Sequence, residues 1–458
     1  MCGIIGVYGV PSASKITFFG LYSLQHRGQE SSGIAVFDGK QVRHYRGMGL
    51  VSEVFDEKIL QELPGDIAVG HVRYSTAGSS TIINAQPFCV NYAKKTIALA
   101  HNGNLVNAES LRCELEEEGH IFQTTMDSEV IVHLIVKHLK EGLVEAISKA
   151  MQRIKGAYSV VMLVDGTLVA FRDPHGFRPL SLGMLNGGYV IASETCAFDL
   201  LSAEYLRDIA PGEILVIDEN GPQSYFPFES PQRLAHCIFE FIYFARPDST
   251  IFGKNVYLVR KRLGEKLYEE CPLSADFVMP FPDSGNYAAI GYAAKAHLPF
   301  EFGVIRNHYI GRTFIQPSEK LRDLSVRMKL NPVKELIRGK EVIVIDDSLV
   351  RGTTSKNRIR SIKLAGARAI HFLITCPPLR YPCFFGIDFP SKQELIAAKH
   401  SIEEIRKFLD IETLYYLSLE GMLSAVEDLS DKVCTACFTG DYPVPLQQPF
   451  RKDFAEVK

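Results

Sequence analysis

One run in the second half of the chain combines the residues of a phosphate site with a pair of acids. It reads Val342-Ile343-Val344-Ile345-Asp346-Asp347-Ser348-Leu349-Val350-Arg351-Gly352-Thr353-Thr354. Consecutive β-favouring aliphatics predict a strand buried on both faces of a parallel sheet, with the acids at its carboxyl edge, where such sheets bind ligands. A helix predicted from Ser355 to Ala365 would aim its N-terminus and the loop N–H groups at one phosphate. Paired carboxylates beside a phosphate suit the hydroxyls of a ribose or a shared magnesium ion.

The acid pair also has a plainer explanation, in which it only ends a strand and caps a helix. The complete run favours the phosphate site. No Gly-Lys-Ser/Thr follows and no Gly-x-Gly-x-x-Gly precedes the helix, which argues against nucleoside triphosphate and dinucleotide loops. The run resembles the phosphoribosyl-diphosphate (PRPP) loop of the type I phosphoribosyltransferases. The resemblance implies PRPP contacts from Asp346, Asp347, Ser348, Arg351, Gly352, Thr353 and Thr354.

A second reactive group stands at the start of the chain, where Cys2 follows Met1. We expect Met1 to be removed, which leaves a cysteine with a free α-amino group. The reference pKa of that amine, about 7.7 to 8.0, lies near that of a thiol, about 8.5, so the amine can take the thiol proton at neutral pH. One residue would then be nucleophile and base. A cysteine at this position is incidental in most chains, so its surroundings must support the role.

Four stretches supply those surroundings: Cys2-Gly3-Ile4-Ile5-Gly6, His26-Arg27-Gly28-Gln29, Gly70-His71-Val72-Arg73-Tyr74-Ser75-Thr76 and His101-Asn102-Gly103-Asn104. With Met126-Asp127-Ser128-Glu129, their order resembles the glutaminase domain of the N-terminal nucleophile class II amidotransferases, over roughly residues 2 to 215. The resemblance implies that Cys2 attacks the side-chain amide of glutamine. The Asn102 amide and the Gly103 N–H would hold the oxyanion.

Three charged residues would bind the rest of glutamine. Arg73 can grip the α-carboxylate, Asp127 can accept from the α-ammonium, and Arg27 helps to close the pocket. The plainer alternatives are a surface ion pair for Arg73 and a helix N-cap for Asp127. His71 and His101 are expected to be hydrogen-bonded framework, because the α-amine already supplies the base.

A further strand, loop and helix precede the central run. The sequence Phe277-Val278-Met279-Pro280-Phe281-Pro282-Asp283-Ser284-Gly285 is followed by a helix predicted from Asn286 to Lys295. By resemblance this is the diphosphate loop, where Ser284 joins Asp346 and Asp347 around magnesium and Gly285 lets the backbone approach the pyrophosphate; a simple N-cap is the alternative. The basic segment from Arg306 to Lys329 contains Tyr309-Ile310-Gly311-Arg312-Thr313-Phe314-Ile315, which resembles a flexible lid. Arg312 and Lys329 are the expected diphosphate contacts.

Four cysteines outside these motifs form a candidate metal set. Cys434-Thr435-Ala436-Cys437 is a two-thiolate clip, and Cys237 and Cys383 could complete it. Spacing alone leaves zinc, an iron-sulfur cluster and core thiols open. The remaining cysteines are expected to be small buried or half-buried hydrophobes, namely Cys89, Cys113, Cys196, Cys271 and Cys376.

The elements that must position these residues fall into two domains. At 458 residues the chain exceeds one ordinary core. Short alternating strands and helices, including 127–139 and 143–153, fill the first half, and strands followed by helices recur in the second. We expect domains at 2–225 and 232–445, joined within 219–231, and a tail at 446–458. Their expected folds are an α+β N-terminal nucleophile domain of four αββα layers and an α/β phosphoribosyltransferase domain with a parallel sheet.

Composition excludes several classes of protein. With 46% hydrophobic residues and a net charge of −3, the chain shows no bias towards nucleic acid or membrane. No apolar run is long enough to span a bilayer, and ten cysteines without a close-spaced framework do not indicate a secreted disulfide protein. We therefore expect a cytoplasmic protein with reduced thiols.

With both halves in this order, the chain from Cys2 to about Pro445 resembles the amidophosphoribosyltransferases. The resemblance implies that ammonia freed at Cys2 crosses an internal channel and displaces pyrophosphate from C1 of PRPP, with magnesium as cofactor. One subclass carries a 4Fe-4S cluster on cysteines in these contexts, which implies a cluster on Cys237, Cys383, Cys434 and Cys437. Purine nucleotide inhibitors and a homotetramer or dimer are also implied. Members of that subclass often have a propeptide, whereas only Met1 precedes Cys2 here.

Two rival functions remain. A class II amidotransferase with another ammonia acceptor would lack the PRPP loop. A non-catalytic sensor of PRPP or nucleotides would have no need of Cys2 with Asn102, Gly103 and Asp127. The absence of glutamine-dependent pyrophosphate release would favour the sensor.

Overall fold

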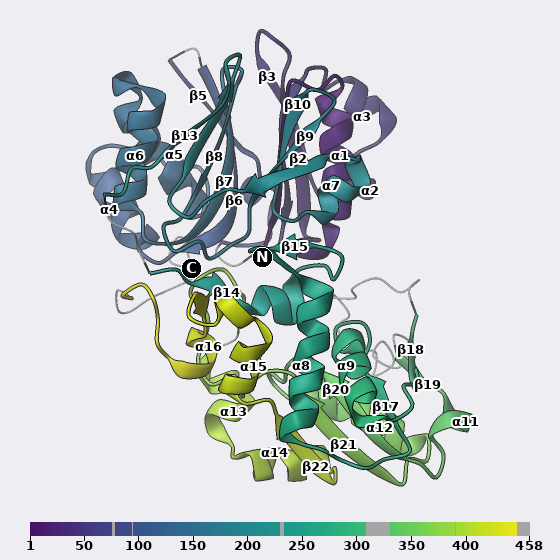
Figure 1. Ribbon diagram of the computed structural model, residues 1–458. Helices are drawn as coiled ribbons and strands as arrows, with labels where there is room; N and C mark the ends of the chain where they lie inside the picture. Colours follow the sequence, from purple (N-terminus) through teal and green to yellow (C-terminus); the bar gives the residue numbers. More distant parts are fainter. Residues whose placement is uncertain (76–77, 94, 230–232, 308–329, 390, 447–458) are drawn as a thin grey trace.

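The computed structural model describes the chain apart from residues 76–77, 94, 230–232, 308–329, 390 and 447–458. The predicted lid, with Arg312 and Lys329, and almost all of the predicted tail lie outside the described residues. Within the described ranges, no helix is long and apolar enough to cross a membrane. Figure 1 shows two bodies, one from each half of the chain, with the N-terminus at their junction.

The N-terminal half contains two antiparallel sheets that lie face to face. The seven-stranded sheet has the order β11 (Glu204–Asp208), β9 (Ser181–Leu185), β10 (Gly188–Ala192), β1 (Gly3–Tyr8), β4 (Ile67–Arg73), β2 (Ser31–Phe37) and β3 (Val42–Met48). The six-stranded sheet has the order β13 (Gly221–Tyr225), β12 (Ile214–Asp218), β8 (Thr167–Arg172), β7 (Gly156–Val164), β6 (Lys95–Leu105) and β5 (Phe88–Tyr92). The strand β13 therefore lies inside the segment that was predicted to join the two halves.

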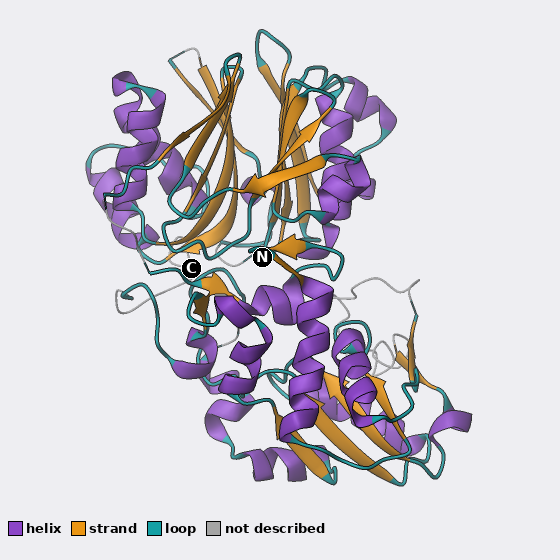
Figure 2. Ribbon diagram, in the orientation of Figure 1, coloured by secondary structure: helices purple, strands orange, loops and turns teal. Residues whose placement is uncertain are grey.

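Helices cover the outer face of each sheet, which gives the four layers seen in Figure 2. The seven-stranded sheet is covered by α1 (Ala13–Ser23), α2 (Val51–Val54), α3 (Glu57–Gln61) and α7 (Cys196–Leu201). The six-stranded sheet is covered by α4 (Ala108–Glu117), α5 (Ser128–His138) and α6 (Leu143–Arg153). The predicted αββα architecture is confirmed, as are the helices predicted over 127–139 and 143–153.

Strand β7 shows why the inner layers are apolar on both faces. Successive side chains of a strand point to opposite sides. Val160 and Met162 therefore face the helices α4 to α6, while Val161 and Leu163 face the other sheet. Every residue of β7 is buried. Because the two sheets pack face to face, residues at the ends of their strands can meet in one site.

The C-terminal half is built on a four-stranded parallel sheet in the order β17 (Phe277–Pro280), β20 (Glu341–Asp346), β21 (Ala369–Ile374) and β22 (Thr413–Tyr416). Its helices are α8 (Val256–Glu270), α9 (Asn286–Ala296), α11 (Lys334–Ile337), α12 (Thr353–Leu364), α13 (Ile396–Lys399), α14 (Ile402–Leu409), α15 (Leu419–Ala425) and α16 (Ala436–Thr439). The predicted α/β fold with a parallel sheet is confirmed. Val342 to Ile345 have no exposed surface, as a strand covered on both faces requires.

Short elements complete the two halves. Two-stranded pairs are formed by β14 (His236–Cys237) with β23 (Val433–Cys434), β15 (Thr250–Ile251) with β16 (Lys254–Asn255), and β18 (Val304–Arg306) with β19 (Leu330–Pro332). Single turns of helix are η1 (Gln25–Arg27), η2 (Ile82–Asn84), η3 (Leu139–Glu141), η4 (Glu240–Phe244), η5 (Lys392–Glu394) and η6 (Glu427–Leu429).

Candidate active sites

The two facing sheets bring Cys2 and Asn102 together. Cys2 precedes β1 of one sheet, and Asn102 lies in β6 of the other. The backbone nitrogen of Cys2 donates to Oδ1 of Asn102 at 3.2 Å. The amide nitrogen Nδ2 of Asn102 is buried and has no hydrogen-bond partner among the described residues. An unpaired buried donor costs free energy, so this N–H group is expected to bind an oxygen that arrives with the substrate.

Gly103 follows Asn102 in a position where only glycine fits. A Cβ placed on Gly103 would lie 2.0 Å from the carbonyl oxygen of Ala157 on the neighbouring strand β7. The two predicted oxyanion residues therefore lie next to each other on β6, within the two-sheet core. Their positions are set by strand pairing.

Arg73 ends β4 and is almost fully buried, with 2% of its surface exposed. Its guanidinium donates to the carbonyl oxygens of Ser79 at 2.9 Å and Gly78 at 3.2 Å, and it lies 4.0 Å from a carboxylate oxygen of Glu30. The alternative of a surface ion pair is wrong, because the group is buried. In this structure Arg73 holds the loop that follows β4.

Asp127 precedes α5 but does not cap it through its side chain. Its Oδ2 accepts instead from the backbone nitrogen of Leu105 at 2.9 Å. Asp127 is thereby tied to the end of β6, three residues beyond Asn102. The helix N-cap was the plainer alternative for this residue, and the observed hydrogen bond does not support it.

Two histidines near Cys2 belong to the framework. The ring of His71 is fully buried and contacts the carbonyl oxygen of His101 at 3.2 Å. Burial lowers the pKa of His71 to about 3, so the ring is neutral at neutral pH. The Nδ1 atom of His101 lies 3.0 Å from the hydroxyl of Ser128. Both rings join β4 and β6 to α5.

Arg27 lies deeper than a pocket-closing loop residue. Its side chain has no exposed surface, and Nε donates to the carbonyl oxygen of Cys2 at 2.9 Å. The same guanidinium pairs with Glu194 and with Glu240, the latter at 2.8 Å. Burial alone lowers the pKa of Arg27, but the two carboxylates outweigh burial and raise it. Sequence reasoning missed both glutamates, since neither stands in a motif.

Met1 precedes Cys2 in the structure and packs into the core of the C-terminal half, with 2% exposure. Burial lowers the pKa of its α-amine to about 5. While Met1 is present, the nitrogen of Cys2 belongs to a peptide bond and cannot accept a proton. The predicted base therefore requires removal of Met1.

At the other site, the acid pair emerges from the carboxyl end of β20. Asp346 and Asp347 are 3% and 7% exposed. One oxygen of Asp347 accepts from the hydroxyl of Ser284 at 2.5 Å, so the loop after β17 meets the loop after β20 as predicted. Burial, together with the neighbouring Asp347 carboxylate, raises the pKa of Asp346 well above its ordinary value, although Arg358 opposes the shift. Two buried carboxylates so placed favour a bound cation or donated hydroxyl groups.

The phosphate loop turns at Gly352, whose φ of 79° is in the left-handed region. Helix α12 then begins at Thr353, two residues before the predicted start, so the Thr353 and Thr354 N–H groups lie in its first turn. Ser348 donates to Asp347 at 2.5 Å. Arg351 is 57% exposed and pairs with Glu394 at 2.9 Å. Apart from Ser348, this loop presents its polar groups to solvent.

Gly285 serves local packing in this structure. A Cβ on Gly285 would lie 2.3 Å from the carbonyl oxygen of Ile345 at the end of β20. The glycine therefore lets the loop after β17 pass close to the central strand. This close passage places Ser284 beside Asp347.

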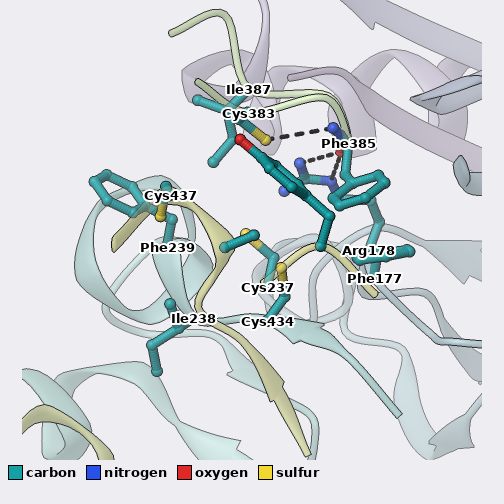
Figure 3. A pocket seen from close by; sticks show the side chains of 12 residues that line it. Phe177, Arg178, Cys237, Ile238, Phe239, Cys383, Phe385, Ile387, Cys434 and Cys437 are labelled. Carbon is teal, nitrogen blue, oxygen red and sulfur yellow. Dashed lines mark hydrogen bonds between the residues drawn. The ribbon is translucent and has the colours of Figure 1, made fainter. Parts of the chain in front are cut away.

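The four candidate cysteines line one pocket at the junction of the halves (Figure 3). Cys237 and Cys434 are opposite one another in the parallel pair β14 and β23. The carbonyl oxygen of Cys437 accepts from the backbone nitrogens of Arg380 and Tyr381, which draws the Cys383 segment alongside. The sulfur of Cys383 accepts from the backbone nitrogen of Phe385 at 3.4 Å. Cys237, Cys383 and the Cys434–Cys437 pair are distant from one another in sequence and meet only in the fold.

Burial shifts three thiols of this pocket towards their protonated form. Burial raises the pKa of Cys237 to about 11 and the pKa values of Cys434 and Cys437 still further, so these thiols need a cation in order to ionise. A single zinc ion would hold its sulfurs about 3.8 Å apart, given Zn–S bonds of about 2.3 Å. Within the described residues, no group of three or more His, Cys, Asp or Glu side chains is placed so that it could hold a metal ion.

The other cysteines mostly follow expectation. All ten are free thiols. Cys196 and Cys376 are buried, and Cys89 and Cys271 are partly buried. The prediction is wrong for Cys113, which is exposed on the outer side of α4 because that helix packs through Leu111 and Leu115.

Comparison with known proteins places both halves in one family. A family model described as a glutamine amidotransferase domain matches residues 71–199. Amidophosphoribosyltransferases align over nearly the whole chain. The chloroplastic protein of Vigna aconitifolia is 50% identical, covering 97% of this chain and 91% of its own. That of Archaeoglobus fulgidus is 49% identical, covering 97% and 98%, and that of Bacillus subtilis is 46% identical, covering 98% and 95%.

Solved structures agree over the same length. The glutamine PRPP amidotransferase of B. subtilis, complexed with ADP and GMP, superposes with a TM-score of 0.94 at 45% identity, covering 99% of this chain and 100% of its own. A structure described as the allosteric regulatory enzyme of purine biosynthesis gives a TM-score of 0.95 at 45% identity, covering 100% and 99%.

Proposed function

Since the chain belongs to the amidophosphoribosyltransferases, glutamine-dependent glycosyltransferases of purine biosynthesis, we propose that its two sites divide the reaction between them. The site at Cys2 releases ammonia from glutamine, and the site at Asp346 joins ammonia to PRPP. Glutamine, water and PRPP become glutamate, 5-phosphoribosylamine and pyrophosphate. The domains that carry the sites are 2–225 and 232–445, with ammonia passing between them through an internal channel.

The Asn102 amide is the observation that carries the glutamine half of this proposal. It holds the nitrogen of Cys2 through Oδ1 and leaves Nδ2 buried, with no hydrogen-bond partner in the part of the chain that the structure describes. In the proposed step the α-amine takes the thiol proton, and the sulfur of Cys2 adds to the amide carbon of glutamine. Asn102 Nδ2 and the Gly103 N–H stabilise the resulting oxyanion. The C–N bond then breaks, ammonia leaves with the proton, and water hydrolyses the thioester to glutamate.

The remaining glutamine contacts come from charged residues around Cys2. We propose that Arg73 binds the α-carboxylate of glutamine and Asp127 its α-ammonium. Asp127 keeps one carboxylate oxygen on Leu105, which fixes the direction of the other. Arg27 supports the nucleophile through the carbonyl oxygen of Cys2. Low exposure of these side chains keeps the charges strong, because water screens them little.

For the phosphoribosyl half, we propose that the loop from Ser348 to Thr354, with Arg351 and Gly352, binds the 5-phosphate of PRPP, and that Asp346 and Asp347 face its ribose. Ser284, Asp346 and Asp347 would hold magnesium, which supplies positive charge beside the leaving pyrophosphate. The contact between Ser284 and Asp347 supports this set. Gly285 would lie next to the pyrophosphate, and Arg312 and Lys329 would neutralise it. Ammonia is a good nucleophile, so this site chiefly positions PRPP and screens charge.

We further propose that the pocket of Cys237, Cys383, Cys434 and Cys437 holds a 4Fe-4S cluster with a structural role. Four sulfurs around one pocket and a backbone N–H donated to the Cys383 sulfur support this assignment. Iron and acid-labile sulfide in anaerobically purified protein would test it, with about four of each per chain expected. Stoichiometric zinc without iron would refute it.

Regulation, assembly and location are further proposals. Purine nucleotides are proposed inhibitors, because the B. subtilis structure holds ADP and GMP. A homotetramer or dimer is proposed from the family, and no nucleic acid or membrane partner is expected. A cytoplasmic location accords with ten free thiols.

Replacing the nucleophile tests the division of labour. Cys2→Ala should lose glutamine-dependent activity by more than about 1,000-fold while keeping activity with free ammonia. Glutamate, pyrophosphate and phosphoribosylamine are measured with each nitrogen source. Loss of both activities in a folded protein would show that the sites are not separate.

A further inference from the structure

A carboxylate of the C-terminal half reaches the glutamine site. Glu240 begins η4, three residues after Cys237, and its side chain has no exposed surface. Its oxygens accept from Arg27, at 2.8 Å from Nη2 and 3.0 Å from Nη1. Arg27 in turn donates from Nε to the carbonyl oxygen of Cys2 at 2.9 Å. Two hydrogen bonds therefore separate Glu240 from the backbone of the nucleophile.

The geometry of Arg27 leaves its guanidinium little freedom. A guanidinium is planar and presents its donors in a fixed fork. Nε of Arg27 points to Cys2, while Nη1 and Nη2 both point to Glu240. A bidentate pair of hydrogen bonds to one carboxylate fixes the plane of the guanidinium, whereas a single hydrogen bond does not. Glu240 thus sets the direction from which Arg27 holds Cys2.

Glu194 supports the same arginine from the N-terminal half, but it is shared among several donors. It accepts from His26 Nε2, from the backbone nitrogen of Arg246 and from the hydroxyl of Ser249, each at 2.8 Å. Burial raises the pKa of Glu194, but His26 and Arg27 outweigh burial and lower it, so the group is ionised. Glu194 contacts only Nη1 of Arg27, whereas Glu240 spans both terminal nitrogens.

A second contact joins the C-terminal half to the oxyanion strand. The carbonyl oxygen of Phe384 accepts from Nδ2 of Asn104 at 2.9 Å. Gly386 lies against Gly103, since a Cβ on Gly386 would be 3.2 Å from the Gly103 carbonyl carbon. The nucleophile and the oxyanion residues are therefore both braced by residues beyond position 236. Neither brace is visible in the glutaminase motifs.

We propose that Glu240 is a positioning residue of the glutamine site, which clamps Arg27 against the Cys2 carbonyl and so fixes the nucleophile relative to Asn102. The proposal rests on the proposed function of Cys2. A displacement of about 1 Å at a reacting atom can cost about 100-fold in rate. Glu240 also pairs with Arg178 at 3.3 Å, so the competing explanation is simple neutralisation of buried arginine charge.

Two substitutions separate positioning from charge balance. Glu240→Gln keeps the shape but removes the charge, and Glu240→Asp keeps the charge but withdraws it by about one methylene. We expect kcat for glutamine hydrolysis to fall about 10- to 100-fold in Glu240→Gln and at least about 3-fold in Glu240→Asp. In both, the KM for glutamine stays within about 3-fold and ammonia-dependent activity within about 2-fold, because the side-chain partners of Glu240 among the described residues are Arg27 and Arg178, outside the PRPP loops.

Glu213→Gln is the matched control. Glu213 is also a fully buried carboxylate clamped to an arginine, Arg207 at 2.7 Å. Its other side-chain hydrogen bonds among the described residues come from the Ala210 nitrogen and the Ser224 hydroxyl, which do not contact the glutamine site. We expect both activities of Glu213→Gln to match the parent protein.

Three results would overturn the proposal. They are full glutamine kcat in Glu240→Asp, an equal loss of the glutamine and ammonia activities in Glu240→Gln, and the same selective loss in Glu213→Gln. If Glu240→Gln does not fold, Glu240→Asp still decides, because it leaves the buried charges balanced. Cys2→Ala shows which of the two proposals has failed. If Cys2→Ala keeps glutamine-dependent activity, the proposed function is wrong. If Cys2→Ala loses that activity but the Glu240 variants keep it, only the positioning role of Glu240 is wrong.

Discussion

The two sites of this protein differ in how much of each is in place before a substrate binds. Around Cys2, the side chains of Asn102, Arg27 and Arg73 are buried and already hydrogen-bonded to one another or to nearby backbone. At the phosphate loop, Arg351, Thr353 and Thr354 are exposed. A covalent step needs a nucleophile aligned within a fraction of an ångström, so its groups are locked in a core. A highly charged ligand brings its own binding energy and can organise an open loop.

The difference has a structural origin. The proposed glutamine site lies where two sheets and the second half of the chain meet, so its residues are restrained from several sides. The PRPP loops lie at the edge of one parallel sheet, where only the strand ends and helix α12 restrain them. Substitutions at the first site should therefore reduce only the glutamine-dependent activity, whereas substitutions at the second should reduce the glutamine- and ammonia-dependent activities together.

The largest effect is expected at the acid pair. Asp347→Asn removes the carboxylate that meets Ser284 and faces the ligand edge. We expect glutamine- and ammonia-dependent activities to fall together by about 100- to 1,000-fold, because both reactions need PRPP and magnesium in place. Steady-state rates with each nitrogen source measure this. Retained ammonia activity would mean that the acid pair does not serve the phosphoribosyl site.

The next effect is expected at the oxyanion amide. Asn102→Ala removes Nδ2, for which the described residues offer no hydrogen-bond partner, and the acceptor of the Cys2 nitrogen. We expect about a 100- to 1,000-fold loss in kcat with glutamine and no more than about a 2-fold change with ammonia. Equal losses with the two nitrogen sources would contradict the separation of the sites.

Lowering the pH should change the contributions of the two sites to folding stability in opposite directions. The pKa of His71 falls from 6.5 to about 3 on folding, so the unfolded chain binds the extra proton between these values. Stability from this group is complete above pH 6.5 and declines by roughly 3 kcal/mol as pH drops to 4. The pKa of Asp346 is raised on folding, so acid favours the folded state at that site. Denaturant midpoints between pH 7 and 4 measure the sum.

His71→Gln is the variant that separates these contributions. Its amide can still donate to the His101 carbonyl oxygen but does not titrate. We expect a shallower loss of stability from pH 6.5 to 4 than in the parent protein. An unchanged slope would show that His71 is not the titrating group.

The smallest effect concerns the exposed loop. Arg351→Gln breaks the pair with Glu394, in which both side chains are at least half exposed. Such pairs contribute about 0 to 1 kcal/mol, so the melting temperature should barely change. The KM for PRPP should rise by about 3- to 10-fold at unchanged kcat, because a phosphate contact is lost. A large loss of stability would mean that the open loop is as locked as the glutamine site.

Contiguous motifs of the sequence determined much of this description. The apolar run Val342 to Ile345 predicted the central strand, and the residues after it predicted the loop and helix, because strand burial and turn chemistry are local properties. The order of the Cys2, Arg73 and Asn102 motifs resembles that of the class II amidotransferases, and this resemblance implied the four-layer half. The helix start at Thr353 differed by two residues from prediction, within the usual fraying of helix ends.

Tertiary structure alone decided the contacts between residues far apart in the chain. No pattern in the sequence pairs Cys237 with Cys434, or Arg27 with Glu240, since no periodicity connects positions separated by such distances. Cys113 was misjudged for the same reason, because only the packing of α4 shows which face is covered. A motif indicates the local structure and chemistry of its own segment. Which segments contact one another is determined by the packing of one half against the other. That packing is why a carboxylate beyond position 236 lies beside the nucleophile at position 2.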